Sequence, residues 1–202
     1  ERGELVREIK AGAQEADIGA ALPAGYRDLW RFALASGLRL AECFLRWDQI
    51  DWEAGTITVV QKGQRDHTIP LTLEMQAILG ACRGHHATWV FCYVARRTRI
   101  RGRLIWERGK RYPVTYSGMK SEWRRKVKTE LDLDLRFHDT RHTRATRLLR
   151  KTGNLKAVQR LLGHADIDTT ARYYAHVTLE DVREALERDD NPRRNSRRDS
   201  TG

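Results

Sequence analysis

The 202-residue sequence has few cysteines and no long apolar run, and each absence argues against a class of protein. Cys43, Cys82 and Cys92 are odd in number, far apart and without the paired spacing of a zinc site, so we expect reduced, mostly buried thiols. No uncharged apolar stretch suggests a membrane span or a signal peptide. No internal repeat is visible either. A disulfide scaffold, a paired-cysteine zinc module and a membrane protein are therefore disfavoured.

What the sequence has in excess is positive charge. It contains 38 lysines and arginines against 27 acidic residues, a formal net charge of +11. Residues 189–202 contribute only +1 of this, so +10 lies on the rest of the chain, where it can form a phosphate-binding face. A basic balance alone does not identify a polyanionic partner, so the function has to be argued from particular residues.

The length and an ordinary apolar fraction of 40% predict one compact domain. Residues 1–22 are polar and rich in Ala and Gly, and we interpret them as a frayed start or the remnant of a linker. Residues 23–188 contain the periodic segments and are the predicted domain. Residues 189–202 are rich in Arg, Asn, Ser and Asp and are expected to be a disordered basic tail.

The elements predicted within the domain are mainly helical. The first helix follows Pro23, and its apolar residues have i, i+3, i+4, i+7 spacing: Tyr26, Leu29, Trp30 and Ala33. Residues 56–60 alternate as a strand, and a glycine-containing turn leads to a second strand with Ile69 and Leu71, which predicts a β-hairpin with Lys62 at its tip. Thr72 is the expected N-cap of the next helix.

In the second half, residues 89–94 and 106–116 are candidate strands around a basic run. Further helices are expected after Ser117, at 138–152, at 155–162, at 169–174 and at 179–188. The predicted fold class is therefore α+β: a mainly helical domain with a small antiparallel β-sheet.

A set of six positions supplies the residue types that phosphodiester transfer requires: Arg39, Lys62, His138, Arg141, His164 and one of Tyr173 or Tyr174. Two arginines can bind the nonbridging oxygens of a phosphodiester and stabilise the charge of a pentacoordinate transition state. A tyrosine hydroxyl, with a reference pKa of about 10, attacks more readily beside cations and a histidine acceptor. A lysine at a mobile hairpin tip can protonate the leaving oxygen. Such a site needs no metal and no cofactor.

Four segments resemble boxes of the tyrosine recombinase (phage integrase) family. Residues 36–42 (SGLRLAE) resemble its first arginine box, and residues 61–71 its β-hairpin lysine segment. Residues 138–146 (HDTRHTRAT) resemble its His-x-x-Arg box, with Thr140 in place of the usual leucine. Residues 161–176 resemble its final histidine and nucleophile region. The elements occur in the family's order across roughly residues 24–188, which makes the set far more specific than any one of them.

The resemblance implies the catalytic fold of that family and a role for each residue. Arg39 and Arg141 would bind the scissile phosphate, and Lys62 would protonate the leaving 5′ hydroxyl. His138 would assist proton transfer, and His164 would hydrogen-bond the phosphate. Attack by the tyrosine would give a 3′-phosphotyrosyl intermediate, which the 5′ hydroxyl of the partner strand reseals without ATP or metal.

Two adjacent tyrosines compete for the nucleophile's role. Tyr173 is nine residues after His164, the commonest spacing in the family. Tyr174 is ten residues after it but stands in Tyr-Ala-His, which matches the family's Tyr-x-His ending. We assign Tyr174 as the nucleophile and keep Tyr173 as the alternative.

The resemblance also implies partners. Double-stranded DNA is the expected substrate, and the family's C-terminal segment suggests self-association, as a tetramer on DNA, through the helix at 179–188. The expected location is the cytoplasm, in association with the nucleoid. The chain starts directly before the catalytic region, without the helical core-binding domain that usually precedes it, so we expect it to be part of a longer protein.

The sequence also permits other interpretations of these residues. Each residue alone has a simple explanation, such as a surface arginine, a turn lysine or a core tyrosine. His138 and His142 could suggest a metal pair, but no third ligand or His-Glu-x-x-His motif accompanies them. The helices at 138–152 and 155–162 have the spacing of a helix-turn-helix regulator, and a type IB topoisomerase-like enzyme would use the same intermediate. The basic stretch 96–111 could equally be a DNA-contacting hairpin or a solvated loop.

Overall fold

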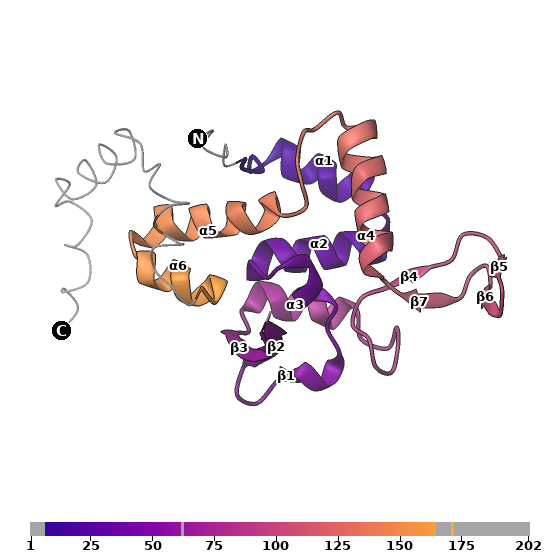
Figure 1. Ribbon diagram of the computed structural model, residues 1–202, viewed down its shortest axis with the longest axis horizontal. Coiled ribbons are helices and arrows are strands. Elements are labelled where there is room, and N and C mark those ends of the chain that lie inside the picture. The colour runs from indigo at the N-terminus through magenta and orange to yellow at the C-terminus, as the bar shows by residue number, and fades with distance from the viewer. Residues whose placement is uncertain (1–6, 62, 165–170, 172–202) are drawn as a thin grey trace, which may run out of the picture.

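The computed structural model describes residues 7–61, 63–164 and 171 (Figure 1). The helical elements are α1 (Ala13–Ala21), α2 (Ala24–Ser36), η1 (Leu40–Cys43), η2 (Trp47–Gln49), α3 (Leu73–Ala81), α4 (Tyr116–Trp123), η3 (Arg124–Glu130), α5 (Asp139–Thr152) and α6 (Leu155–Leu162). The strands are β1 (Ile50–Asp51), β2 (Thr56–Gln61), β3 (Arg65–Pro70), β4 (Cys92–Val94), β5 (Arg99–Arg101), β6 (Leu104–Trp106) and β7 (Arg111–Pro113). Every strand pair is antiparallel, and the predicted α+β class with a mainly helical domain is confirmed.

Helix α2 is the centre of the fold, with α1, α3, α5 and β4 packed around it (Figure 1). It follows Pro23, where a proline is tolerated because the first N–H groups of a helix have no partner within it. Leu29, Phe32 and Ala33 on this helix are completely buried. Gly25 permits the close approach to β4, since a Cβ there would collide with the carbonyl of Cys92. The helix predicted after Pro23 is confirmed.

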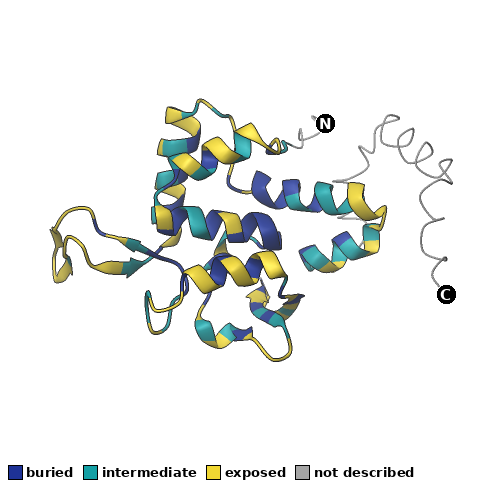
Figure 2. Cartoon of the chain, turned by 180° about the vertical axis from the view of Figure 1, so that it is seen from behind, coloured by how far each residue is buried: buried dark blue, intermediate teal, exposed yellow. Residues whose placement is uncertain are grey.

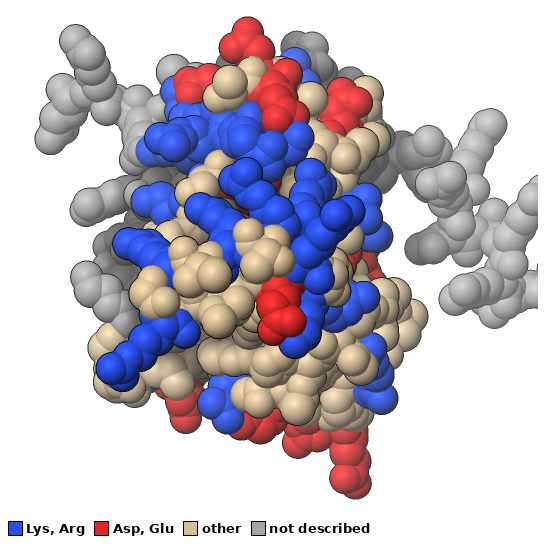
Figure 3. Space-filling view, turned by 90° about the vertical axis from the view of Figure 1, so that its right-hand side faces the viewer, with Lys and Arg blue, Asp and Glu red and all other residues tan. Residues whose placement is uncertain are grey.

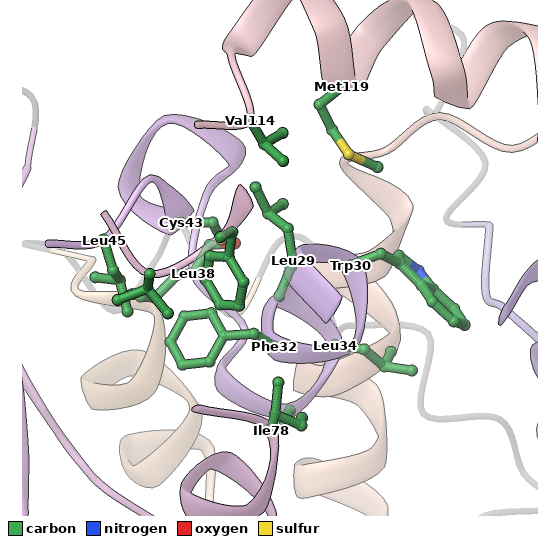
Figure 4. Close-up of a cluster of buried hydrophobic side chains, with 14 of the residues drawn as sticks. Leu29, Trp30, Phe32, Leu34, Leu38, Cys43, Leu45, Ile78, Val114 and Met119 are labelled. Carbon is green, nitrogen blue, oxygen red and sulfur yellow. The ribbon is translucent and has the colours of Figure 1, made fainter. Parts of the chain in front are cut away.

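The core extends from α2 in several directions (Figure 4). Figure 4 labels its side chains from α2, from the segment after it, from α3, from the residue that follows β7 and from α4: Leu29, Trp30, Phe32, Leu34, Leu38, Cys43, Leu45, Ile78, Val114 and Met119. The three cysteines are free and buried, as expected, and burial raises the pKa of the Cys43 thiol well above its usual range. Exposed residues lie on the outer faces of the helices and on a projecting arm (Figure 2).

The predicted β-hairpin is formed by β2 and β3, with β1 added at the edge. Ile57 pairs with Ile69 and Val59 with His67, so the alternation of the sequence puts Ile57, Val59 and Ile69 on the buried face. Lys62 lies outside the described residues.

The N-terminal segment differs from the frayed start expected for residues 1–22. Residues Ala13–Ala21 form α1, and Ile9, Ile18 and Leu22 are at most 2% exposed. The backbone N–H of Ile9 also donates to the hydroxyl of Thr143 on α5 at 2.9 Å. The small number of apolar residues concealed this packing, because among the described residues 7–22 only these three side chains enter the core.

Helices α5 and α6 follow the predicted boundaries closely. Gly153 ends α5 in the left-handed region, with φ of 62°. The side chain of Asn154 then caps α6 by accepting the N–H of Ala157 at 2.9 Å. Apart from Ala171, the helices predicted at 169–174 and 179–188 lie outside the described residues. Within the described part of the chain, no helix is long and apolar enough to cross a membrane.

Candidate active site

The first arginine of the predicted set is positioned by the turn that ends α2. Gly37 takes φ of 69°, and its N–H donates to the carbonyl of Ala33 at 2.9 Å. Arg39 follows in an extended conformation, directly before η1. The sequence Ser-Gly-Leu-Arg therefore turns the chain away from α2 and presents Arg39 at the end of that helix.

Glu42 holds Arg39 at both its backbone and its side chain. The Arg39 N–H donates to Oε2 of Glu42 at 2.8 Å, and Arg39 Nη1 donates to Oε1 at 2.9 Å. The Glu42 side chain is 4% exposed, whereas that of Arg39 is 38% exposed. A buried carboxylate thus fixes a guanidinium that still faces solvent, which is the arrangement needed to bind an anionic ligand.

Arg141, in contrast, is almost completely buried, at 4% exposure. It lies in the first turn of α5, where Nη1 donates to the carbonyl of Gly37 at 2.8 Å and Nη2 donates to the carbonyl of Leu162 at 2.5 Å. Its Nη1 is also 3.9 Å from Oε2 of Glu42. These contacts compensate a buried charge that would otherwise be strongly unfavourable. They also tie together the end of α2, the start of α5 and the end of α6.

His164 lies just beyond α6, after a left-handed Gly163 with φ of 62°. Its Nε2 is 3.4 Å from Nη2 of Arg141, and its backbone exchanges hydrogen bonds with Gln159. Burial, and next the positive charges of Arg141 and Arg39, lower the pKa of His164 to about 4. The imidazole is therefore neutral at pH 7, with Nε2 able to accept from Arg141.

His138 immediately precedes α5, and its ring packs edge-on against His142 with 4.7 Å between centroids. Burial is the largest cause that lowers the pKa of His138 to about 4, followed by the charges of His142 and Arg141. Arg39 acts in the same direction on both His138 and His164. The four residues thus form one electrostatically coupled group with two neutral imidazoles beside two permanent cations.

The remaining predicted residues are Lys62, Tyr173 and Tyr174, and all three lie outside the described residues. The neighbours of Lys62 are described, however. The side chain of Gln61 packs against Gly163, where a Cβ would be 2.5 Å from Gln61 Nε2. On the other hairpin strand, His67 Nε2 is 3.1 Å from the carbonyl of Leu161. The hairpin that carries Lys62 is therefore attached to the end of α6, next to His164.

The predicted set omitted two residues that shape the site. Glu42 lies in the motif at residues 36–42 but is not one of the six predicted site residues. An acid three residues after Arg39 is nevertheless a recognisable signal for an i, i+3 ion pair. Gln61 had no such signal, because its role depends on contact with Gly163, about a hundred residues further along the chain. Among the described residues, no group of three or more His, Cys, Asp and Glu side chains could hold a metal ion.

Comparison with known proteins gives consistent results. Residues 6–180 match the phage integrase family. The tyrosine recombinase XerC of Xylella fastidiosa (strain M23) is 32% identical over 163 residues, which cover 78% of this chain and 51% of that protein. The chain thus spans about half the length of this relative.

Several solved structures share the fold. The crystal structure of XerA recombinase matches with a TM-score of 0.64 at 21% identity, over 95% of this chain and 66% of that one. The Tn1549 transposon integrase, in complex with circular intermediate DNA, matches with a TM-score of 0.64 at 24% identity, over 93% and 68% of the two chains. At these identities the likeness concerns the fold alone.

Proposed function

Since the chain belongs to the phage integrase family, we propose that it cleaves and rejoins DNA strands as the catalytic part of a site-specific recombinase. The observation that carries this proposal is the coupling of Arg39 and Arg141 through one buried carboxylate, that of Glu42. Two guanidinium groups held at adjacent positions match the two nonbridging oxygens of a phosphodiester.

The two arginines have different tasks in this mechanism. Arg141 is fixed by carbonyls of Gly37 and Leu162, so its charge is oriented before substrate arrives. Arg39 keeps more than a third of its side chain exposed and binds the incoming phosphate. Preorganised charge of this kind stabilises a transition state with little reorganisation, and the loss of one such donor typically costs about 100-fold or more in rate.

The reaction proceeds by exchange of one phosphodiester for another. The hydroxyl oxygen of Tyr174 attacks the phosphorus, the bond to the 5′ oxygen breaks, and Lys62 gives that oxygen a proton. His138, neutral at pH 7, assists removal of the tyrosine's proton, and His164 hydrogen-bonds the phosphate. The energy of the broken bond is retained in the phosphotyrosyl ester, so resealing by a 5′ hydroxyl requires no ATP, and no step requires a metal.

The proposed substrate is duplex DNA, and the proposed active assembly is a tetramer on that DNA, joined through the segment 179–188. The apolar residues Leu179, Val182 and Leu186 support this role by their helical spacing. An enzyme of this kind acts where the chromosome is, so we propose the cytoplasm, in association with the nucleoid, as its location.

A helix-turn-helix regulator is less well supported. Residues 139–143 at the start of α5 are buried, and Arg141 contacts the protein's own carbonyls rather than pointing outward. A regulator would also leave the pairing of Arg39 with Glu42 without a purpose. A topoisomerase-like enzyme shares the chemistry and differs in its product, a relaxed circle rather than exchanged strands.

The test is capture of the covalent intermediate. Duplexes selected by the protein from a random pool are resynthesised with a 5′-bridging phosphorothiolate at each position of the bound site, because the thiol that is released reseals poorly. We expect a protein–DNA adduct on a denaturing gel. Adduct formation should fall about 100-fold or more in Arg141→Ala and Arg141→Lys, with little change in affinity for DNA.

The matched control is Arg150→Ala, on the same helix. Its side chain is 55% exposed and its Nη1 pairs with Glu8 at 2.7 Å, so this variant should form the adduct at the normal rate. Adduct that persists in both Arg141 variants, or binding to selected DNA without any adduct, would contradict the proposal.

A further inference from the structure

The residues that run from the end of β4 to the first residue of β7 hold most of the net charge of the molecule. Residues 96–111, which we call the arm, contain seven arginines and one lysine against a single acidic residue, Glu107. The arm thus carries +7 of the chain's +11 in sixteen positions. Glu107 pairs with Lys110 at 2.7 Å, and among the described residues none of the seven arginines forms an ion pair.

The arm is a structured ribbon rather than a loose loop. It projects from the body on paired strands β4 and β7 and ends in the paired strands β5 and β6 (Figure 1). Gly102, with φ of 59°, makes the two-residue turn at its tip. Between the two ribbons, the N–H of Ala95 donates to the carbonyl of Lys110 at 2.9 Å, and the hydroxyl of Tyr112 accepts the N–H of Glu107 at 2.8 Å.

The register of the tip separates its side chains onto two faces. Ile100 pairs with Ile105 on one face, while Arg99 and Arg101 lie on the other. Ile100 and Ile105 on the first face are 72% and 55% exposed, and Leu104 on the second is 60% exposed, so the body of the protein covers neither face. Such a ribbon has no core of its own, and its exposed apolar and cationic groups are available to a partner.

The chemistry of the arm favours duplex DNA as that partner. Closely spaced arginines without carboxylates repel one another, and a polyanion removes this repulsion. A two-stranded ribbon fits the major groove of B-DNA, which is about 12 Å wide, and its flanking arginines reach phosphates on both sides. Apolar side chains at the tip of such a ribbon are suited to contact thymine methyl groups in the groove. Figure 3 shows lysines and arginines across the face from which the arm projects, with acidic residues mostly at its edges.

We propose that the arm binds a groove of duplex DNA outside the catalytic centre, an inference that rests on the proposed function for its substrate. The root of the arm lies at the start of α2, where Gly25 approaches Cys92, and the catalytic cluster begins at Gly37 at the end of the same helix. Thirteen helical residues span about 20 Å. The arm therefore contacts DNA about six base pairs or more from the scissile phosphate, at 3.4 Å per base pair.

The test compares two triple variants with equal loss of charge. The arm variant is Arg99→Ser, Arg101→Ser, Arg103→Ser, and the control is Arg31→Ser, Arg83→Ser, Arg124→Ser, three exposed arginines elsewhere on the body. The measurements are the affinity of each for the selected duplex as a function of salt, and hydroxyl-radical footprints. The slope of log K against log salt is negative, and we expect its magnitude to be smaller by about 1 to 3 in the arm variant, since each phosphate contact contributes about 0.9. In the arm variant, protection of the DNA from hydroxyl radicals should disappear only at the position distal to the scissile phosphate. The control variant should keep protection both there and around the scissile phosphate.

Adduct formation with saturating phosphorothiolate DNA should stay normal in the arm variant. This separates the two proposals: loss of adduct in the unaltered protein overturns the proposed function, whereas equal slopes and footprints in both triple variants overturn the arm proposal alone. A second variant, Ile100→Ser with Ile105→Ser, keeps the charge. It should weaken the distal footprint with an unchanged slope. Suppose instead that this double variant keeps the distal footprint but, without DNA, sediments differently from the unaltered protein. That result would identify the arm as a protein-docking surface and overturn the proposal.

Discussion

Glu42 and Arg141, two almost fully buried residues a hundred positions apart in the sequence, lie 3.9 Å apart, from Oε2 to Nη1. The same carboxylate accepts hydrogen bonds from the backbone and side chain of Arg39. A single acidic group therefore holds the solvent-facing Arg39 by hydrogen bonds and supplies negative charge beside the buried Arg141, whose position the carbonyls of Gly37 and Leu162 fix. Both arginines of the site thus interact with Glu42.

Replacement of Glu42 tests this dependence. Glu42→Gln removes the negative charge while keeping the size, and leaves the buried Arg141 hydrogen-bonded to the carbonyls of Gly37 and Leu162. We expect a loss of about 2–4 kcal/mol in the free energy of unfolding, measured in urea, because the buried guanidinium of Arg141 loses the neighbouring negative charge of Glu42. Glu107→Gln, at an exposed pair, should cost less than about 0.5 kcal/mol. Equal stability of the two variants would show that Glu42 is not the support described.

Two glycines with the same backbone conformation form a matched pair for the next prediction. Gly153 and Gly163 both have φ of 62°, but a Cβ at Gly153 meets nothing within 4 Å, whereas one at Gly163 meets the amide of Gln61. Gly153→Ala should therefore cost only the left-handed strain, about 1–2 kcal/mol. Gly163→Ala should cost up to about 1 kcal/mol more, because the amide of Gln61, which is 9% exposed, has to move.

The same pair separates stability from function. Gly163→Ala displaces the side chain of Gln61, which precedes Lys62 in the hairpin. It also changes the backbone at position 163, directly before His164. We expect slower adduct formation at saturating DNA in this variant and a normal rate in Gly153→Ala, compared under conditions where both are folded. Equal rates would show that contact between the hairpin and α6 does not position the site.

The two histidines predict how stability depends on pH. Their pKa values in the folded protein, about 4, lie below the ordinary value of 6.5. The unfolded chain therefore binds more protons between these values, and the contribution to stability is fully present above pH 6.5 and is lost as the pH falls toward 4. The measurement is the Tm from pH 7.5 to 4.5. His138→Asn and His164→Asn should each make the decline shallower, and a decline unchanged in both variants would contradict the assignment.

The sequence predicted much of this fold because its strongest signals are local. The apolar spacing after Pro23, the alternation around Ile57 and the Gly153–Asn154 boundary each depend on residues within one or two turns. The packing of Ile9 and Ile18 was not predictable in this way, since it depends on contacts with distant helices.

In the candidate site, too, local motifs were predictable from sequence and tertiary contacts were not. The motifs identified Arg39, His138, Arg141 and His164, and the structure brings these four together. Their environment was not accessible from sequence: the burial of Arg141, the carbonyls that hold it and the depressed pKa values all arise from tertiary contacts. The nucleophile and Lys62 lie outside the described residues, so their assignment remains a prediction from the motifs.

The most direct test of the central claim is to identify the residue in the covalent adduct. The adduct trapped on phosphorothiolate DNA is digested with nuclease and protease, and the peptide that retains a nucleotide is sequenced by mass spectrometry. We expect the modification on Tyr174, with adduct abolished by Tyr174→Phe and retained by Tyr173→Phe. Modification of Tyr173 instead would move the nucleophile by one residue, whereas the absence of any phosphotyrosyl peptide from a protein that binds its selected DNA would contradict the account as a whole.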